Sequence, residues 1–149
     1  MTHEEYMLAA LELAREAAAD GEIPVGCVIA DADGKIIGRG RNRREKKQRA
    51  SAHAEMEAID AACKSLGAWR LSGCSLYVTL EPCPMCAGAI MNSRIGSVYY
   101  GAKEKLSGSC GSVVNLFMEN YGCSAKIVGG ILAEECAALM RDFFSELRP

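Results

Sequence analysis

The segment CSLYVTLEPCPMCAGAI, residues 74–90, carries the pattern that decides the fold. Its first seven residues are rich in strand-forming side chains and contain few polar ones, which predicts a central strand. Pro82 and Pro84 end that strand, and the small residues that follow predict a helix. The segment therefore predicts a strand that passes directly into a helix.

The same alternation of strands and helices extends in both directions. Thr2 and Glu5 form a capping-box pattern at the start of an amphipathic helix that ends near Gly21. A further helix is expected from about Ser51 to Leu66. The other expected elements are strands at 25–31, 35–41, 96–102 and 125–131, a loop at 108–112, a short helix at 113–118 and a closing helix at 132–147. This order predicts an α/β layered sheet in a single domain over residues 1–149.

The composition is that of an ordinary globular protein, with 50% hydrophobic and 24% charged residues and a net charge of −2. No apolar run approaches the ~20 residues that a membrane-spanning helix needs. The N-terminal region is acidic and amphipathic, unlike a signal peptide. We therefore expect a cytoplasmic protein with no membrane partner, whose eight cysteines stay reduced.

One segment is strongly basic. RGRNRREKKQR, residues 39–49, holds seven of the 17 lysines and arginines and a single acidic residue, Glu45. A solvated loop would have this composition, and so would a loop that contacts an anionic partner.

Cys83 and Cys86 form a Cys-x-x-Cys pair. Such a pair alone fits a redox motif, half of a structural zinc site or coincidence. This one falls at a strand-to-helix junction, where free backbone amides and the helix dipole stabilise the thiolate form. Thiolate is the form that zinc requires.

A third ligand is available in His53, one of only two histidines in the chain. The other, His3, lies on the expected first helix, and none of Cys74, Cys110 and Cys123 has the spacing of a fourth ligand. Three protein ligands would leave a position for a water molecule, whose pKa zinc can lower to about 7. Glu55, two residues after His53, is then placed to move that water's proton to a substrate.

His53-Ala54-Glu55 and Pro82-Cys83-Pro84-Met85-Cys86 together match the signature of zinc-dependent nucleobase deaminases. Longer segments resemble the bacterial tRNA-specific adenosine deaminases over nearly the whole chain. Among them are NRRE, AHAEMEAI, LGAWRLSGCSLYVTLEPCPMCAGAIMNSRI, GSCGSVVNL and GILAEECAALMRDFF.

This resemblance implies a three-layer α/β/α cytidine-deaminase-like fold with a central mixed sheet of about five strands, and a homodimer. The implied activity is that of a zinc-dependent hydrolase that converts adenosine to inosine at the wobble position of a tRNA anticodon loop. Its partner would be a tRNA anticodon stem-loop and not DNA, and each subunit would hold one zinc ion. The implied zinc ligands are His53, Cys83 and Cys86, the proton shuttle is Glu55, and the residues that contact the substrate are Asn42, Glu104 and Phe144.

The chain departs from the family pattern at two places near the substrate. After the dipeptide Gly-Ala the family commonly has an aspartate and, two residues later, a lysine, whereas this chain has Glu104 and Leu106. Basic residues occur instead at Lys103 and Lys105. Residues 49–51, Arg-Ala-Ser, replace a segment that resembles Asp-Pro-Thr.

Three other functions are compatible with parts of the pattern. A deaminase of free guanine, cytosine or cytidine would share the zinc signature but would not need the basic segment. A non-catalytic, zinc-stabilised RNA-binding domain would enclose its metal with a fourth protein ligand and would have no use for Glu55. A redox protein built on Cys83 and Cys86 would hold no metal.

Overall fold

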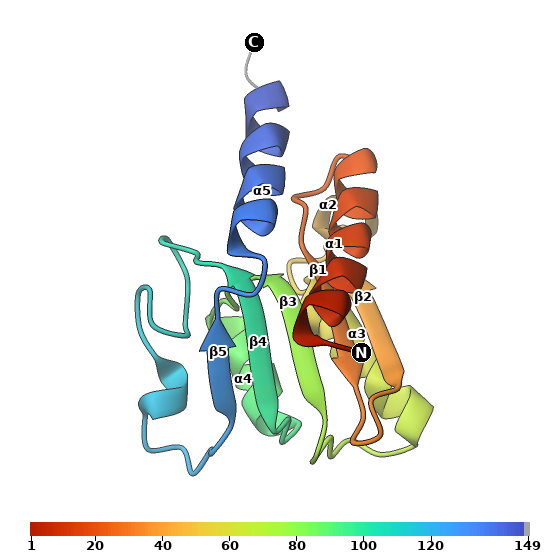
Figure 1. The fold of residues 1–149 in the computed structure, drawn as a ribbon, viewed down its shortest axis with the longest axis vertical. Helices are drawn as coiled ribbons and strands as arrows, with labels where there is room; N and C mark the ends of the chain where they lie inside the picture. The colour runs from red at the N-terminus through yellow and green to blue at the C-terminus, as the bar shows by residue number, and fades with distance from the viewer. Residues whose placement is uncertain (148–149) are drawn as a thin grey trace.

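The computed structural model describes residues 1–147, and its centre is one mixed sheet of five strands in the order β2-β1-β3-β4-β5 (Figure 1). β1 (Gly26–Ala30) pairs antiparallel with β2 (Ile36–Arg41) and with β3 (Ser75–Leu80). β4 (Ser97–Ala102) and β5 (Lys126–Gly129) extend the sheet in parallel with β3. The expected mixed sheet of five strands, with residues 75–80 at its centre, is confirmed.

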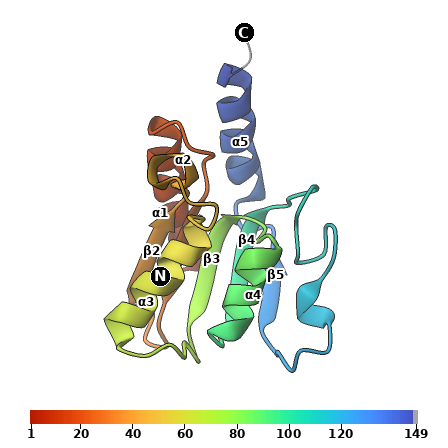
Figure 2. The same ribbon diagram turned by 180° about the vertical axis from the view of Figure 1, so that it is seen from behind.

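Helices cover both faces of this sheet. α1 (His3–Ala19) and α5 (Ala133–Leu147) lie on one face, and α3 (Ala54–Leu66) and α4 (Pro84–Asn92) lie on the other (Figures 1 and 2). Each face has its own apolar core, one formed with α1 and α5 and the other with α3 and α4. The predicted α/β/α layering is therefore confirmed. No helix within residues 1–147 is both long and apolar enough to cross a membrane.

The second predicted helix differs in its start. A short helix, α2 (Arg44–Lys47), occupies part of the basic segment, and α3 begins at Ala54, three residues later than expected. The reason is that His53 has extended backbone angles (φ −84°, ψ 155°) and serves as the N-cap of α3. The predicted short helix at 113–118 is reduced to a single 3₁₀ turn, η1 (Leu116–Met118).

Two glycines on β2 let α3 approach the sheet closely. A Cβ atom at Gly40 would lie 2.1 Å from the backbone oxygen of Ala54, and one at Gly38 would lie 2.3 Å from that of Ala58. Any larger residue would therefore push the helix away from the strand. The glycines set the depth at which the first turn of α3 sits against the sheet.

Candidate active site

The candidate site lies where α3 and α4 begin. His53 is the N-cap of α3 and Cys83 is the N-cap of α4, and the two helices start at the same edge of the sheet (Figure 2). Neither side chain caps its own helix by a hydrogen bond, so both are free to bind something between the helices. The partial positive charge at each helix N-terminus favours thiolate at this place.

The three predicted metal ligands converge. His53 Nδ1 lies 3.6 Å from Cys83 Sγ and 3.5 Å from Cys86 Sγ, and the three ligand atoms lie within 4.8 Å of one another. In a tetrahedral zinc site, Zn–S bonds of ~2.3 Å and Zn–N bonds of ~2.0 Å place neighbouring nitrogen and sulfur atoms about 3.5 Å apart. The donor set and its spacing therefore fit zinc.

Only three side chains make up this group. Within residues 1–147 no aspartate, glutamate or further cysteine joins His53, Cys83 and Cys86, so Cys74, Cys110 and Cys123 are not a fourth ligand. A four-coordinate zinc ion held here would keep one position for a ligand that the protein does not supply. That is the arrangement of a catalytic zinc site, and it differs from that of a structural one.

The two cysteines are electronically different. A hydrogen bond from the Cys86 thiol, helped by one from His53, lowers the pKa of Cys83 to about 4 despite partial burial. The same hydrogen bond, together with burial, raises the pKa of Cys86 well above its ordinary value. The pair therefore already holds one thiolate at neutral pH, ready to bind a cation.

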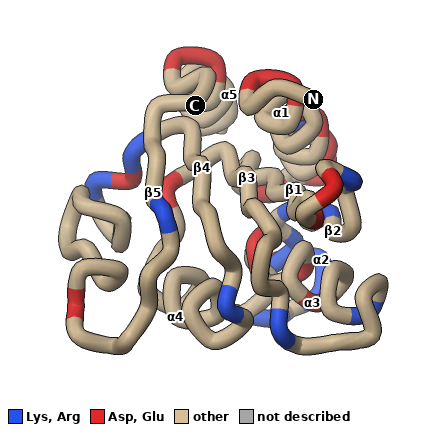
Figure 3. The backbone as a smooth tube through the Cα atoms, turned by 60° about the horizontal axis from the view of Figure 1, so that its bottom comes forward, with Lys and Arg blue, Asp and Glu red and all other residues tan. Residues whose placement is uncertain are grey.

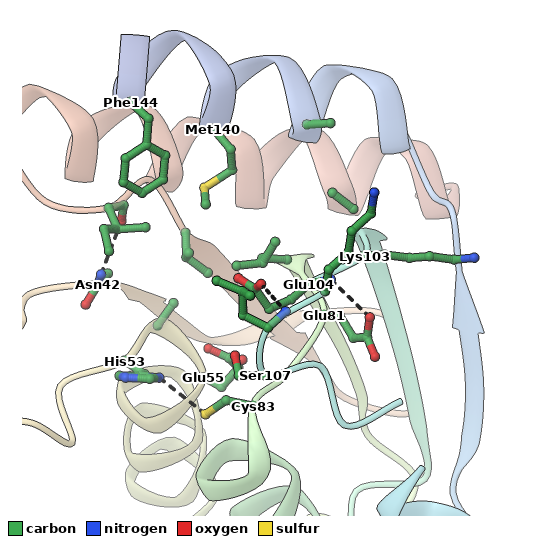
Figure 4. A pocket seen from close by; sticks show the side chains of 18 of the residues that line it. Asn42, His53, Glu55, Glu81, Cys83, Lys103, Glu104, Ser107, Met140 and Phe144 are labelled. Atoms are coloured by element: carbon green, nitrogen blue, oxygen red, sulfur yellow. Dashed lines mark hydrogen bonds between the residues drawn. The ribbon is translucent and has the colours of Figure 1, made fainter. Parts of the chain in front are cut away.

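Glu55 lies in the first turn of α3 and is 4% exposed. Burial, reinforced by the neighbouring Cys83, raises its pKa to about 7, although His53 opposes the shift. Figure 4 shows the carboxylate directed into the same cavity as His53 and Cys83. A buried carboxyl group in this position can both accept and release a proton near neutral pH.

The cavity in front of the three ligands has a volume of about 570 Å³. Its wall includes Asn42, His53, Glu55, Cys83, Glu104 and Phe144, which are six of the seven site residues expected from the sequence. The seventh, Cys86, is fully buried behind them. Residues of α2, α3 and α5, the ends of β3 and β4 and the segments next to them thus meet around one opening (Figure 4).

The three residues expected to contact the substrate occupy different parts of this wall. Asn42 is 6% exposed, and its side chain donates to the backbone oxygen of Ile23 (3.3 Å) and accepts from the backbone nitrogen of Arg44 (3.4 Å). The Glu104 carboxylate accepts from the backbone nitrogen of Leu106 at 2.9 Å. Phe144 is 42% exposed and extends from α5 over the opening (Figure 4).

Most of the basic segment is neutralised within the protein. Arg41 pairs with Glu16 at 3.0 Å and with Asp20 at 3.1 Å, whereas Arg43 and Lys47 both pair with Glu57, at 3.3 Å and 2.8 Å. Figure 3 shows acidic and basic positions interleaved around α2 and α3. The solvated-loop interpretation is therefore too simple, because these cations hold the segment against α1 and α3.

Arg44 differs from these neighbours. It lines the cavity, and no carboxylate within residues 1–147 forms an ion pair with it. Lys103 and Lys105 line the wall formed after β4 and also have no ion pair in the part of the chain that the structure describes. Arg44, Lys103 and Lys105 are thus three cations at the cavity that no carboxylate among the described residues neutralises.

One residue of the site, Glu81, was missed in the sequence. It ends the segment before Pro82-Cys83 and is 2% exposed. Burial raises the pKa of its carboxyl group, but hydrogen bonds from Ser112, Cys110 and Glu104 outweigh this, so the pKa is below its ordinary value. The only sequence signal for this residue was an acidic side chain at the end of a buried strand. Its hydrogen-bond donors lie more than 20 residues downstream and could not be identified from the sequence.

Comparison with known proteins agrees with this geometry. The family described as the cytidine and deoxycytidylate deaminase zinc-binding region matches residues 1–102. A tRNA-specific adenosine deaminase of Bacillus subtilis (strain 168) is 49% identical over 150 residues, which cover 99% of this chain and 92% of the relative. The similarity to that relative therefore includes α5 and every residue that lines the cavity.

Two solved structures add a comparison of fold. One, from a study of A-to-I editing by tRNA:A34 deaminases at the wobble position of transfer RNA, has a TM-score of 0.87 at 40% identity, and covers 91% of this chain and 98% of that chain. The other, a guanine deaminase from Bacillus subtilis, has a TM-score of 0.66 at 46% identity, and covers 69% of this chain and 66% of that chain. The similarity to the tRNA enzyme extends over more of the molecule.

Proposed function

We propose that this chain, which belongs to the cytidine and deoxycytidylate deaminase family and carries its His/Cys/Cys zinc group, converts adenosine to inosine at the wobble position of a tRNA anticodon loop. The observation that carries the proposal is a set of three metal ligands beside the buried carboxylate of Glu55, in a cavity open to solvent-borne substrate. A redox protein or a purely structural zinc domain would have no use for that carboxylate.

His53, Cys83 and Cys86 would hold a zinc ion, which would supply the nucleophile by lowering the pKa of a water molecule towards 7. Glu55 moves the proton. Its carboxylate would accept one proton from the attacking water and pass it to the ring nitrogen beside C6 of adenine, and would then take the second proton from the hydroxyl group added to C6 and pass it to the departing amino group. The net reaction consumes one water molecule and releases ammonia, so Glu55 returns to its starting state.

The cavity wall supplies contacts for a base that has been turned out of an RNA loop. Asn42 and Glu104 would hold the target nucleotide, and this is supported by the position of both residues in the cavity wall. Phe144 offers an exposed aromatic face at the opening, on which a neighbouring anticodon-loop base can stack. An anticodon loop presents such bases without the cost of opening a duplex.

A deaminase of free guanine is the second candidate, because one similar structure is a guanine deaminase. Two features favour the RNA substrate. The cavity of about 570 Å³ is roomy for a single base, and three cations without an ion pair among the described residues, Arg44, Lys103 and Lys105, line it and are available for phosphate groups. A free base offers such cations nothing to bind.

The remaining parts of the proposal concern partners and location. We place the protein in the cytoplasm, where the proposed tRNA substrate is available. We also propose a homodimer, for which the supporting feature is a run of exposed apolar side chains at residues 113–121, whose turn η1 contacts α4, together with one exposed side chain of α4. They are Met85, Val113, Val114, Met118 and Tyr121.

The decisive experiment is incubation of the zinc-loaded protein with three substrates: an arginine anticodon stem-loop with adenosine at the wobble position, free guanine and free cytidine. Nucleoside analysis would then measure inosine, xanthine and uridine. We expect inosine at the wobble position alone. Efficient formation of xanthine with no inosine would replace the proposed function by the guanine deaminase.

A further inference from the structure

Glu81 is a buried carboxylate that the proposed chemistry does not use. It follows β3, two positions before the zinc ligand Cys83, and its side chain points towards residues 103–112, here called the rim loop. The rim loop follows β4, and its first five residues line the cavity. A carboxylate with so little exposure to water must find its hydrogen-bond donors within the protein.

Every donor to this carboxylate comes from the rim loop. Oε1 accepts from the backbone nitrogen of Glu104 at 3.1 Å and from the Ser112 hydroxyl. Oε2 accepts from the backbone nitrogens of Cys110 at 2.9 Å and Ser112 at 3.1 Å. Both ends of the loop are therefore hydrogen-bonded to one side chain. Figure 4 shows the end at which Glu81 lies beside Glu104.

The middle of the rim loop packs closely against the same carboxylate. A Cβ atom at Gly108 would lie 2.5 Å from Glu81 Cδ and 2.4 Å from the backbone oxygen of Glu104. Ser109 adds a bond from its backbone nitrogen to the Pro82 oxygen at 2.9 Å. The loop is thus folded against residues 81–82, immediately before the first cysteine ligand.

The tip of this loop has few other contacts to order it. Leu106 at its tip is 91% exposed, and the loop contains no residue of a regular helix or strand. Lys103 and Lys105 form no ion pair within residues 1–147. Hydrogen bonds to an ionised acceptor are roughly twice as strong as neutral ones, so Glu81 adds a strong restraint to the loop's own backbone hydrogen bonds.

We propose that Glu81 is a positioning residue that holds the rim loop as one wall of the cavity, and so determines how tightly the RNA substrate binds without taking part in proton transfer. This inference rests on the proposed function, since it concerns the fit of the anticodon loop against Lys103, Glu104 and Lys105. Because the rim loop and Cys83 attach to neighbouring residues, the wall keeps a fixed position relative to the zinc group.

The test uses two variants that disturb the same contact from opposite sides. Glu81→Gln keeps the shape but directs an amide NH₂ group at backbone N–H donors. Gly108→Ala places a methyl group against the Glu81 carboxylate. Glu12→Gln, on the exposed face of α1, makes the same chemical change as the first variant at a position outside the cavity and serves as the control.

For each protein we would measure zinc content, kcat, KM and Kd for the anticodon stem-loop, and amide hydrogen exchange. We expect Glu81→Gln and Gly108→Ala to speed exchange at the Glu104, Cys110 and Ser112 amides. Loss of one or two charge-assisted hydrogen bonds should raise KM and Kd about tenfold or more. The value of kcat should change less than about threefold, zinc content should stay equal to that of the wild type, and the control should match the wild type throughout.

The outcomes separate the two proposals. Unchanged exchange or unchanged KM in both variants would overturn the role of Glu81, and so would a fall in kcat or loss of zinc with KM unaffected. If the wild type binds the stem-loop but makes no inosine, the proposed function fails, while the Kd values of the variants still decide whether Glu81 positions the rim loop.

Discussion

His53 Nδ1 lies 3.5 Å from Cys86 Sγ, although the two residues are 33 positions apart in the chain. The contact arises because α3 and α4 pack side by side on one face of the sheet and begin at the same edge. The metal ligands are thus brought together at the N-termini of two helices. One helix lies in the connection after β2 and the other in the connection after β3. The following predictions test what this arrangement does.

Replacing Glu55 by glutamine should abolish deamination while zinc stays bound, because the residue moves a proton and does not belong to the ligand group. General acid–base catalysis contributes roughly 10²–10⁴-fold, so kcat should fall by at least about 100-fold. Inosine formation in single turnovers and metal analysis by mass spectrometry would measure the two properties. Full activity of Glu55→Gln would remove this residue from the mechanism.

Replacing Cys83 by alanine should remove zinc and lower the melting temperature, because metal that binds only the folded state stabilises that state. Cys123→Ala is the matched control, since Cys123 is also partly exposed but lies outside the ligand group. A Cys83→Ala protein that keeps one zinc ion per chain would contradict the assignment.

Zinc affinity should fall as the pH is lowered, because protons compete with the metal for the same atoms. A hydrogen bond with Cys83 raises the pKa of His53 above its ordinary value of about 6.5. A raised pKa means that His53 takes up its proton at a higher pH, so the affinity should begin to fall above pH 6.5. A chelator competition series from pH 8 to pH 5 would measure this.

Replacing Arg44 by alanine should weaken binding of the anticodon stem-loop and reduce the slope of log Kd against log salt by about one. Arg41→Ala should leave that slope unchanged, because Arg41 is already paired with Glu16 and Asp20. Fluorescence anisotropy would measure the Kd of each variant at salt concentrations between about 50 and 200 mM. Equal slopes of log Kd against log salt for the two variants would show that pairing with carboxylates inside the protein does not determine which cations bind RNA.

The protein should be a dimer in solution that is disrupted by Met118→Asp, because Met118 is 81% exposed within the apolar run proposed as the interface. Leu8→Asp is the control, since Leu8 is 50% exposed on α1, away from that run. Light scattering after size-exclusion chromatography would give the mass of each. A wild-type protein that remains monomeric at micromolar concentration would refute the dimer.

The sequence alone determined the order of the main elements, with α2 missed, as well as the layering and the zinc group. Strand and helix periodicities and the Thr2–Glu5 capping box depend on neighbours a few residues away, so they can be recognised locally. The same holds for His53-Ala54-Glu55 and for the Cys83–Cys86 pair. Their chemistry lies in residue type and short spacing, and the structure brings them together as expected.

Only the tertiary structure decided which charges are available and what shapes the cavity. Arg41 is neutralised by α1, 21 to 25 positions earlier, whereas Arg44 is not, although both belong to one basic segment. Glu81 meets its donors 23 to 31 positions later, in a loop with no regular pattern of its own. Such contacts depend on how distant segments of the chain pack together. Long-range ion pairs and hydrogen bonds therefore produce no periodic pattern that could be recognised in the sequence.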